Sequence, residues 1–234
     1  MQTIDNNGLV YWNEREIKLR NQIAEDIILQ MYTSARVSNK QWTFHRIEAP
    51  VLINKSLIHP NYDETDYYTV DEELALRPET TATSYLYAVD YLKHYSKKKA
   101  LPFCVVQLGL SFRKEQDKTL KHMRLKSFYQ LEFQFLYSAD SKADYVTWLR
   151  NAAENAINNW YPFVDQKPSD RLPCYSNSTE DIITVDENPM ELASMSDRTD
   201  FPDLNIRNVE IAIGIDRLLT KVMDTFYSQE QEND

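Results

Sequence analysis

The chain has 234 residues, of which 42% are hydrophobic and 26% charged, a length and composition suited to one globular domain. Its 26 Lys and Arg against 36 Asp and Glu give a net charge of −10, which disfavours non-specific binding to nucleic acid or membrane surfaces. Three glycines are present, about 1% where about 7% is usual, and this excludes the glycine-rich phosphate loops of many nucleotide-binding proteins. Any phosphate must therefore be held by side chains.

The cysteines and the apolar runs limit where the protein can work. Cys104 and Cys174 lie far apart without a C-x-x-C spacing, which predicts two free thiols and no zinc site. The sequence shows no apolar leader at its N-terminus and no run of about 18 apolar residues. We therefore expect a single domain over residues 1–234, located in the cytoplasm and without a membrane partner.

The first half of the chain predicts two helices and a broken strand. The first helix carries Ile23, Ile27 and Met31 close to helical spacing. Pro50 interrupts the following β-rich run, as on an edge strand or an interface strand. In chain order we expect a helix over 12–36, a β-rich run over 44–54, a solvent-exposed acidic loop over 60–73 and a second helix over 79–95.

The second half predicts a long hairpin and further strands. In chain order we expect strands over 102–115 and 124–138, a helix around 141–160, a short strand near 181–186, a strand over 189–195, and a strand that runs through Gly214 into a final helix. Strands joined by hairpins, with helices grouped separately, predict an α+β fold built on an antiparallel sheet.

The hairpin concentrates positive charge in an acidic protein. Residues 113–126 hold six Lys or Arg against two acids. Alternation along the second strand places Phe128, Gln130 and Glu132 on one face of the sheet. By itself the pattern also fits a solvated amphipathic hairpin.

A match to a known pattern favours a functional interpretation. FRKE at 112–115, a loop, and RLKSF at 124–128 resemble motif 2 of the class II aminoacyl-tRNA synthetases. GIDR at 214–217 resembles their motif 3, and the strand that ends at Pro50 resembles their weaker motif 1. Motifs 2 and 3 stand in the family's order, about 100 residues apart. The resemblance implies a class II synthetase-like antiparallel sheet flanked by helices, with ATP and Mg²⁺ as cofactors and a homodimer built through motif 1.

Three further stretches resemble the glycyl-tRNA synthetases. They are LRPETTAT (76–83), CYSNSTEDI (174–182) and ELASMSDRTDFPDL (191–204), and NVEIAIGIDR before the final helix is similar as well. The resemblance spans roughly residues 44–222 and implies activation of a small amino acid, glycine, for transfer to tRNA.

The resemblance also implies how ATP would be held. Arg113 would bind the α-phosphate and the amino-acid carboxylate, while Arg124 and Arg217 would bind the β- and γ-phosphates. Phe128 would stack on one face of the adenine and Arg217 on the other, and Glu115 would accept from the adenine amino group. Arginine suits these tasks because its planar guanidinium binds phosphate through two hydrogen bonds.

The remaining implied roles concern the amino acid. Glu79, Glu132 and Glu210 would surround its ammonium group, with Gln130 and Arg198 nearby. Three carboxylates in one small pocket destabilise a fold unless a cation fills the pocket, which favours a substrate site.

The same resemblance implies a metal ligand and a reaction. Glu191 would be the Mg²⁺ ligand, since hard oxygen donors suit that ion. The reaction would be in-line attack of the amino-acid carboxylate on the α-phosphate, with Arg113 and Arg217 as the catalytic residues. A carboxylate is already ionised at pH 7, so no general base is required.

Several features depart from the glycyl pattern. Thr83 and Ser194 stand where that family has glycine, and Ala212 stands where it has serine. We expect about a dozen residues after the final helix and no anticodon-binding domain among them. Three hypotheses therefore stay open: a minimal glycyl-tRNA synthetase-like enzyme, a paralogue that passes the activated amino acid to a carrier protein or another acceptor, and a non-catalytic accessory subunit similar to polymerase-accessory proteins.

Overall fold

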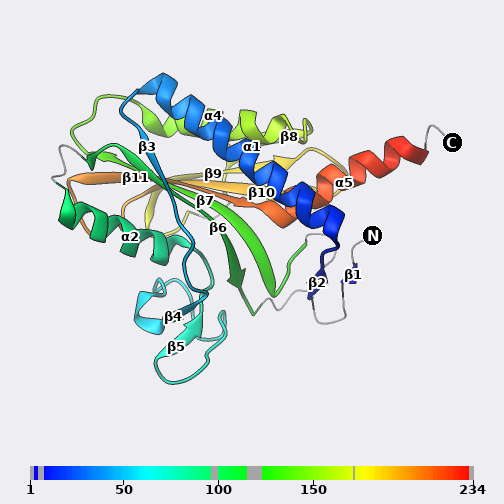
Figure 1. Ribbon diagram of the computed structural model, residues 1–234, viewed down its shortest axis with the longest axis horizontal. Coiled ribbons are helices and arrows are strands. Elements are labelled where there is room, and N and C mark those ends of the chain that lie inside the picture. Colours follow the sequence, from blue (N-terminus) through cyan, green and yellow to red (C-terminus); the bar gives the residue numbers. More distant parts are fainter. Residues whose placement is uncertain (1–2, 5–7, 96–99, 115–122, 171, 232–234) are drawn as a thin grey trace.

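The computed structural model describes residues 3–4, 8–95, 100–114, 123–170 and 172–231. Their centre is a seven-stranded sheet (Figure 1). Its strands in spatial order are β3 (Thr43–Arg46), β6 (Phe103–Phe112), β7 (Ser127–Ser138), β11 (Ile206–Gly214), β10 (Glu191–Arg198), β9 (Ser176–Thr184) and β8 (Val164–Pro168). The α+β class and a central sheet flanked by helices are thus confirmed.

The sheet is mixed, so the expectation of a purely antiparallel sheet is wrong at one pair. β3 pairs with β6 in parallel, whereas the other neighbouring strands pair antiparallel. A parallel pair needs a long crossover. Here the chain between the two strands forms a small lobe with β4 (Leu52–Asn54), the short 3₁₀ helix η1 (Lys55–Leu57) and β5 (Leu74–Leu76), and then helix α2 (Thr81–His94).

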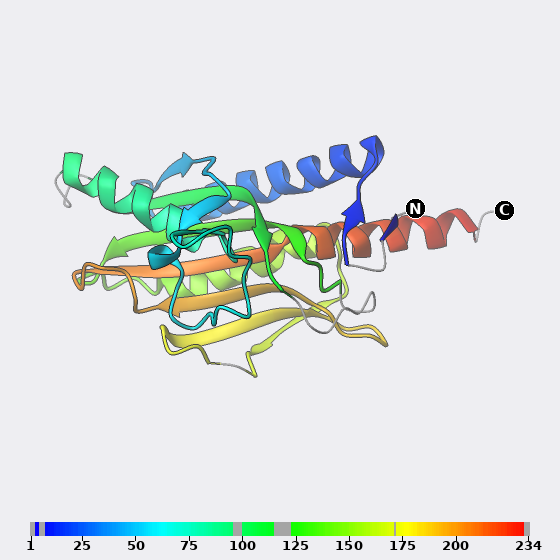
Figure 2. The ribbon, with the colours of Figure 1, turned by 90° about the horizontal axis from the view of Figure 1, so that it is seen from below.

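Three of the described helices cover the apolar face of the sheet, and α2 packs on the opposite, polar face. α1 (Glu14–Ser38), α4 (Tyr145–Asn158) and α5 (Ile215–Gln231) share one buried cluster with the strands, and α2 packs a second, smaller cluster against β6 and β7. In both views α5 runs out past the end of the sheet, toward the side where the two termini lie (Figures 1 and 2). A separate two-stranded pair, β1 (Thr3–Ile4) with β2 (Val10–Tyr11), precedes α1.

Helix α1 follows the sequence prediction closely. Its N-terminus is a capping box, in which Asn13 accepts from the backbone N–H of Glu16 and Glu16 accepts from that of Asn13. Ile23, Ile27 and Met31 are fully buried, as the helical spacing predicts. Strong local signals of both kinds explain why this helix was predictable within two residues at each end.

Strict alternation gives the sheet two different faces. On β7, Leu131, Phe133 and Phe135 face the helices and are completely buried, while Gln130 and Glu132 face the other way, into the cavity described below. β9, β10 and β11 alternate in the same way. The polar face of the sheet is therefore where functional side chains gather.

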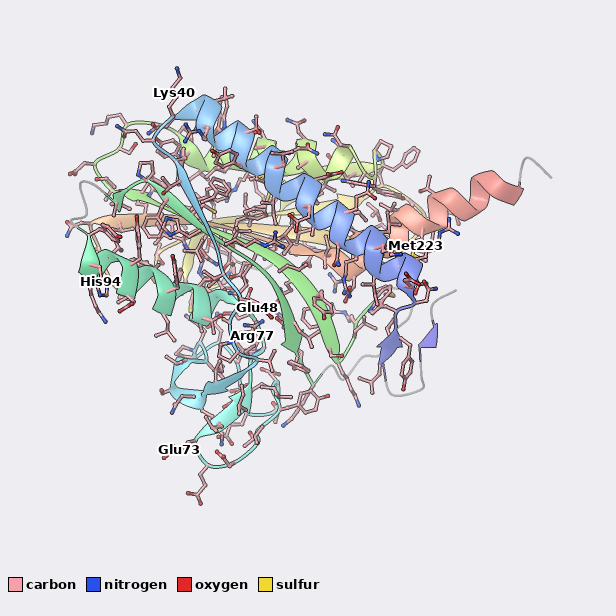
Figure 3. All side chains as sticks on the ribbon, viewed as in Figure 1. Lys40, Glu48, Glu73, Arg77, His94 and Met223 are labelled. Carbon is pink, nitrogen blue, oxygen red and sulfur yellow. The ribbon has the colours of Figure 1, made fainter. Side chains whose placement is uncertain are left out.

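The lobe is anchored to the sheet by Arg77. Its guanidinium, 2% exposed, donates to the backbone carbonyls of Ala49, Pro50 and Leu110 at 2.9–3.2 Å. A Cβ at Gly109 would lie 2.5 Å from Nη2 of Arg77, so β6 needs a glycine there. Figure 3 places Arg77 at the junction of lobe and sheet.

Two predicted elements need correction. Residues 60–73 are turn-rich, but they are not simply a solvent-exposed loop, because Tyr67 is 6% exposed and Tyr62 lines the cavity. Glu73, by contrast, lies at the outer tip of the lobe (Figure 3). The short strand predicted near 181–186 is the longer β9, and β8 was missed because its sequence, VDQKP, lacks an apolar alternation.

Candidate functional site

A cavity of about 300 Å³ opens on the polar face of the sheet. It is bounded by the sheet, the lobe and the first turn of α5. Nine of the predicted site residues line it: Glu79, Arg113, Arg124, Phe128, Gln130, Glu132, Glu191, Glu210 and Arg217. Arg198 bonds to one of these nine, and Glu115 lies outside the described residues.

Strand register explains why distant residues meet here. Asp181, Ser194, Ala212 and Glu132 are successive Cα partners on β9, β10, β11 and β7. Neighbouring strands are about 4.8 Å apart and residues two apart share a face, so these side chains form one row on the cavity floor. The next row runs through Ser196, Glu210 and Gln134.

One end of the cavity is a network of buried carboxylates. Gln134 Nε2 donates to Glu132 Oε1 at 2.8 Å and to Glu210 Oε2 at 2.6 Å. Arg198 Nη1 donates to both carboxylate oxygens of Glu210, at 2.9 and 3.0 Å, and the hydroxyl of Thr81 donates to it at 2.8 Å. Arg198 also donates through Nε and Nη2 to Asp200, at 3.0 and 2.6 Å, so this one cation serves two carboxylates.

Among the described residues no cation bonds directly to Glu132, although the charge of Arg77 interacts with it. Burial, followed by the nearby carboxylates of Glu210 and Glu79, raises the pKa of Glu132 to about 8. The side chain is 1% exposed. At neutral pH the empty site therefore favours the protonated carboxyl, and a bound cation would favour its ionised form.

An aromatic wall encloses the same end. The Tyr62 hydroxyl donates to Glu79 Oε2 at 2.9 Å, and burial raises the pKa of Tyr62 well above its usual value. The Tyr175 ring lies under the Arg198 guanidinium, with Cζ 3.9 Å from the ring centroid. The sequence analysis gave neither tyrosine a role: Tyr62 was assigned to an exposed loop, and Tyr175 was part of the quoted CYSNSTEDI stretch.

The opposite end of the cavity carries the arginines. Arg113 follows β6, donates through Nε to the carbonyl of Pro78 at 3.0 Å, and lies with Cζ 5.2 Å from the Phe128 ring centroid. Arg217 Nη1 donates to the backbone carbonyl of Glu191 at 2.8 Å. Guanidinium groups beside a half-buried aromatic ring that lines a cavity suit a phosphorylated aromatic ligand.

The Glu191 carboxylate suits a Mg²⁺ ion that is held mainly by nucleotide phosphates, rather than one held by protein ligands alone. Its carboxylate is half exposed and lies 3.7 Å from Arg217 Nη1. In the described part of the chain no three His, Cys, Asp or Glu side chains meet in a metal-binding group. Mg²⁺ at nucleotide sites takes one or two carboxylates and completes its shell with phosphate and water, so a single carboxylate is compatible with it.

Two further carboxylates of the cavity were missed by the sequence analysis. Asp181 is buried on the floor and hydrogen-bonds to none of the described residues. Asp216, within GIDR, accepts from the backbone N–H of Tyr129 at 2.8 Å. Burial raises the pKa of Asp216 to about 6. The hydrogen bond from the Tyr129 N–H and the positive charge of Arg20 both act in the opposite direction. The alternation of polar residues along β9 is the sequence pattern from which Asp181 could have been identified.

The three departures from the glycyl pattern fall in two places. Ser194 and Ala212 are cross-strand partners on the cavity floor. Thr83 is buried in α2, where its hydroxyl donates to the carbonyl of Thr80 at 2.8 Å, and it is not among the lining residues. Two of the three changes can therefore alter the shape of the site.

Solved structures of known proteins share this fold. A prolyl-tRNA synthetase of Giardia lamblia, solved with prolyl-adenylate, superposes with a TM-score of 0.69 at 16% identity, over 92% of this chain and 48% of the other. A prolyl-tRNA synthetase of Cryptosporidium parvum, solved with halofuginone and AMPPNP, gives 0.67 at 12% identity, over 95% and 49%. A pyrrolysyl-tRNA synthetase of Desulfitobacterium hafniense gives 0.62 at 18% identity, over 86% and 68%. The chain has the fold of a class II aminoacyl-tRNA synthetase catalytic domain.

Sequence comparison points to the same class. A glycine–tRNA ligase of Mesoplasma florum is 30% identical over 113 residues, which are 46% of this chain and 25% of that protein. The match thus spans about a quarter of the length of this curated relative. No family model matches the chain. None of the described helices is both long and apolar enough to cross a membrane.

Proposed function

We propose that this protein activates a small amino acid, glycine, with ATP to form an aminoacyl-adenylate, and transfers the aminoacyl group to tRNA. One observation carries the proposal: a single cavity joins an arginine and aromatic end to a carboxylate end. ATP brings about four negative charges, and an amino acid brings an ammonium beside a carboxylate. Each end therefore complements one of the two substrates.

The residues at the arginine end would act by positioning and charge stabilisation. An oxygen of the amino-acid carboxylate attacks the α-phosphorus, the bond to the bridging oxygen of the β-phosphate breaks, and pyrophosphate leaves with the electron pair. Arg113 would hold the α-phosphate and the carboxylate, while Arg124 and Arg217 would neutralise the leaving phosphates. Phe128 would stack on the adenine. Mg²⁺ on Glu191 would add charge neutralisation at the phosphates.

The carboxylate end would select the amino acid. Glu79 and Glu132 would face the ammonium, with Gln130 beside them, and Glu210 would share its charge with Arg198. The glycine–tRNA ligase relative supports glycine as the substrate. Ser194 and Ala212 on the floor are the two positions where the pocket differs from the glycyl pattern.

A second candidate is a paralogue that passes the amino acid to a carrier protein or another non-tRNA acceptor. The net charge of −10 favours it, because tRNA binding gains from positive charge on the protein. A non-catalytic accessory subunit is less favoured, because the arginines, Phe128 and the carboxylates of a substrate site are all present in one cavity. We also propose a cytoplasmic homodimer formed through the motif 1 region, the β-rich run that reaches Pro50.

Amino-acid-dependent exchange between ATP and pyrophosphate, measured with each of the twenty amino acids, tests the proposal. Exchange with glycine together with charging of tRNA supports the first function. Exchange without charging supports the second. No exchange with any amino acid overturns both and leaves the accessory role.

A further inference from the structure

Where strand β11 ends, the side chain of Asp216 accepts a hydrogen bond that a further strand residue would otherwise accept. β11 pairs with β7 up to Gly214 and Gln130. One residue earlier on β7, the backbone N–H of Tyr129 has no further β11 residue beside it, and Asp216 Oδ2 accepts from it at 2.8 Å. The Asp216 carboxylate thus continues the strand pairing beyond the last paired residue. It ties the start of β7 to the first turn of α5.

The same carboxylate meets a cation from the N-terminal helix. Arg20 of α1 places Nη1 3.8 Å from Asp216 Oδ1, and both side chains are almost entirely buried. Its guanidinium Cζ also lies 3.8 Å from the centroid of the Tyr129 ring. Arg20 therefore contacts both residues of this hydrogen bond. Its charge attracts the Asp216 carboxylate, and its guanidinium stacks on the Tyr129 ring.

These contacts lie directly beside two proposed ATP-binding residues. Tyr129 follows Phe128 on β7, and alternation points their rings to opposite faces of the sheet. Asp216 precedes Arg217, which lines the cavity and donates to the backbone carbonyl of Glu191. The hydrogen bond from Tyr129 to Asp216 therefore links the backbone of the two walls between which an aromatic base would lie.

We propose that Arg20 and Asp216 are positioning residues, which hold Phe128 and Arg217 at the separation that admits the base of a nucleoside triphosphate. The inference rests on the proposed function and adds to it that helix α1 supports the nucleotide half of the site. The amino-acid half has its own buried cation, Arg198, and does not depend on this pair.

The experiment compares three variants with a matched control. Arg20→Met removes the charge and the stacking, Arg20→Lys keeps the charge, and Asp216→Asn keeps an acceptor for Tyr129 but loses the charge. Arg150→Met is the control, because Arg150 is an equally buried arginine that joins helix α4 to Glu180 on β9 at 2.9 Å. For each protein, calorimetry gives the dissociation constant of ATP, and exchange kinetics gives KM for ATP and for the amino acid.

We expect Arg20→Met and Asp216→Asn to weaken ATP binding about ten-fold while KM for the amino acid stays within about two-fold. Arg20→Lys should recover part of the loss. Arg150→Met should lower the melting temperature and leave both KM values unchanged. A wild-type affinity for ATP in Asp216→Asn, or in Arg20→Lys and Arg20→Met alike, overturns the inference, as does equal weakening of both substrates. A wild-type protein that binds no ATP overturns the proposed function itself.

Discussion

Glu132 offers the sharpest test of the charge arrangement in the cavity. Burial beside Glu210 and Glu79 raises its pKa to about 8, from 4.5 for an unperturbed glutamate. A folded pKa above the unfolded one contributes stability that is complete below the unfolded pKa and is lost as the pH rises through the folded pKa. We therefore expect the free energy of unfolding to fall between about pH 5 and pH 8.

The size of the effect follows from the shift. Each pKa unit corresponds to about 1.4 kcal/mol, so a rise from 4.5 to about 8 sets an upper limit of roughly 5 kcal/mol on the loss of stability. Glu132→Gln removes the titration but keeps a side chain that accepts from Gln134, so its unfolding free energy should lack this pH dependence. The two curves should separate progressively as the pH rises.

Urea unfolding of both proteins between pH 5.5 and 8.5 measures the difference. Glu14→Gln serves as a control, because Glu14 is an exposed member of a surface ion pair and its loss should leave the wild-type curve unchanged in shape. If Glu132→Gln shows the same decline with pH as the wild-type protein, Glu132 is not the group that titrates and the reasoning fails.

The same carboxyl should link amino-acid binding to pH under the proposed function. An ammonium group bound beside Glu132 favours the ionised carboxylate, so binding releases a proton at neutral pH. Affinity for the amino acid should therefore rise from pH 6 to pH 8 in the wild-type protein. Calorimetry in buffers of different ionisation enthalpy counts the released proton, and Glu132→Gln should release none.

Three other substitutions test separate parts of the structure. Arg113→Ala should abolish pyrophosphate exchange while circular dichroism stays that of the wild-type protein; exchange at the wild-type rate would refute the role of Arg113. Gly109→Ala should cost about 1–3 kcal/mol in urea unfolding, because the new Cβ meets Arg77, which its own hydrogen bonds hold in place; an unchanged midpoint would show that Arg77 can move aside. Arg198→Met should cost about 3–5 kcal/mol in urea unfolding by leaving Glu210 and Asp200 without their shared cation, and a cost below about 1 kcal/mol would contradict this.

Local patterns predicted most of the fold, and pairing between distant segments accounts for what they missed. α1 was predictable because its apolar period and its capping box lie within one segment. The parallel pairing of β3 with β6 depends on a partner more than fifty residues away, and nothing in the four residues of β3 specifies its direction. β8 has no apolar alternation, because it is an edge strand whose only neighbour is β9.

The site was predictable to a similar degree and for a related reason. Motif resemblance located the arginines and the three glutamates, since those residues stand in short recognisable stretches. It did not indicate Tyr62, whose acidic surroundings in the sequence suggest solvent, because the tyrosine becomes a wall of the cavity only when the lobe folds back over Glu79. Asp181 was missed too, because its place on the cavity floor depends on the strand pairing that aligns it with Ser194 and Glu132.

The fold tolerates the carboxylate end because its three glutamates are stabilised in different ways. Glu210 shares the positive charge of Arg198 with Asp200 and Glu79 accepts from Tyr62, whereas Glu132 keeps its proton at neutral pH. Gln134 joins Glu132 to Glu210, so ionisation of one carboxyl is felt by the other. An incoming ammonium would add positive charge to a cluster in which one arginine, Arg198, serves both Glu210 and Asp200. Ionising Glu132 costs free energy that the ammonium contact must offset, so an apolar replacement of Glu132 should stabilise the empty protein and abolish amino-acid selection together.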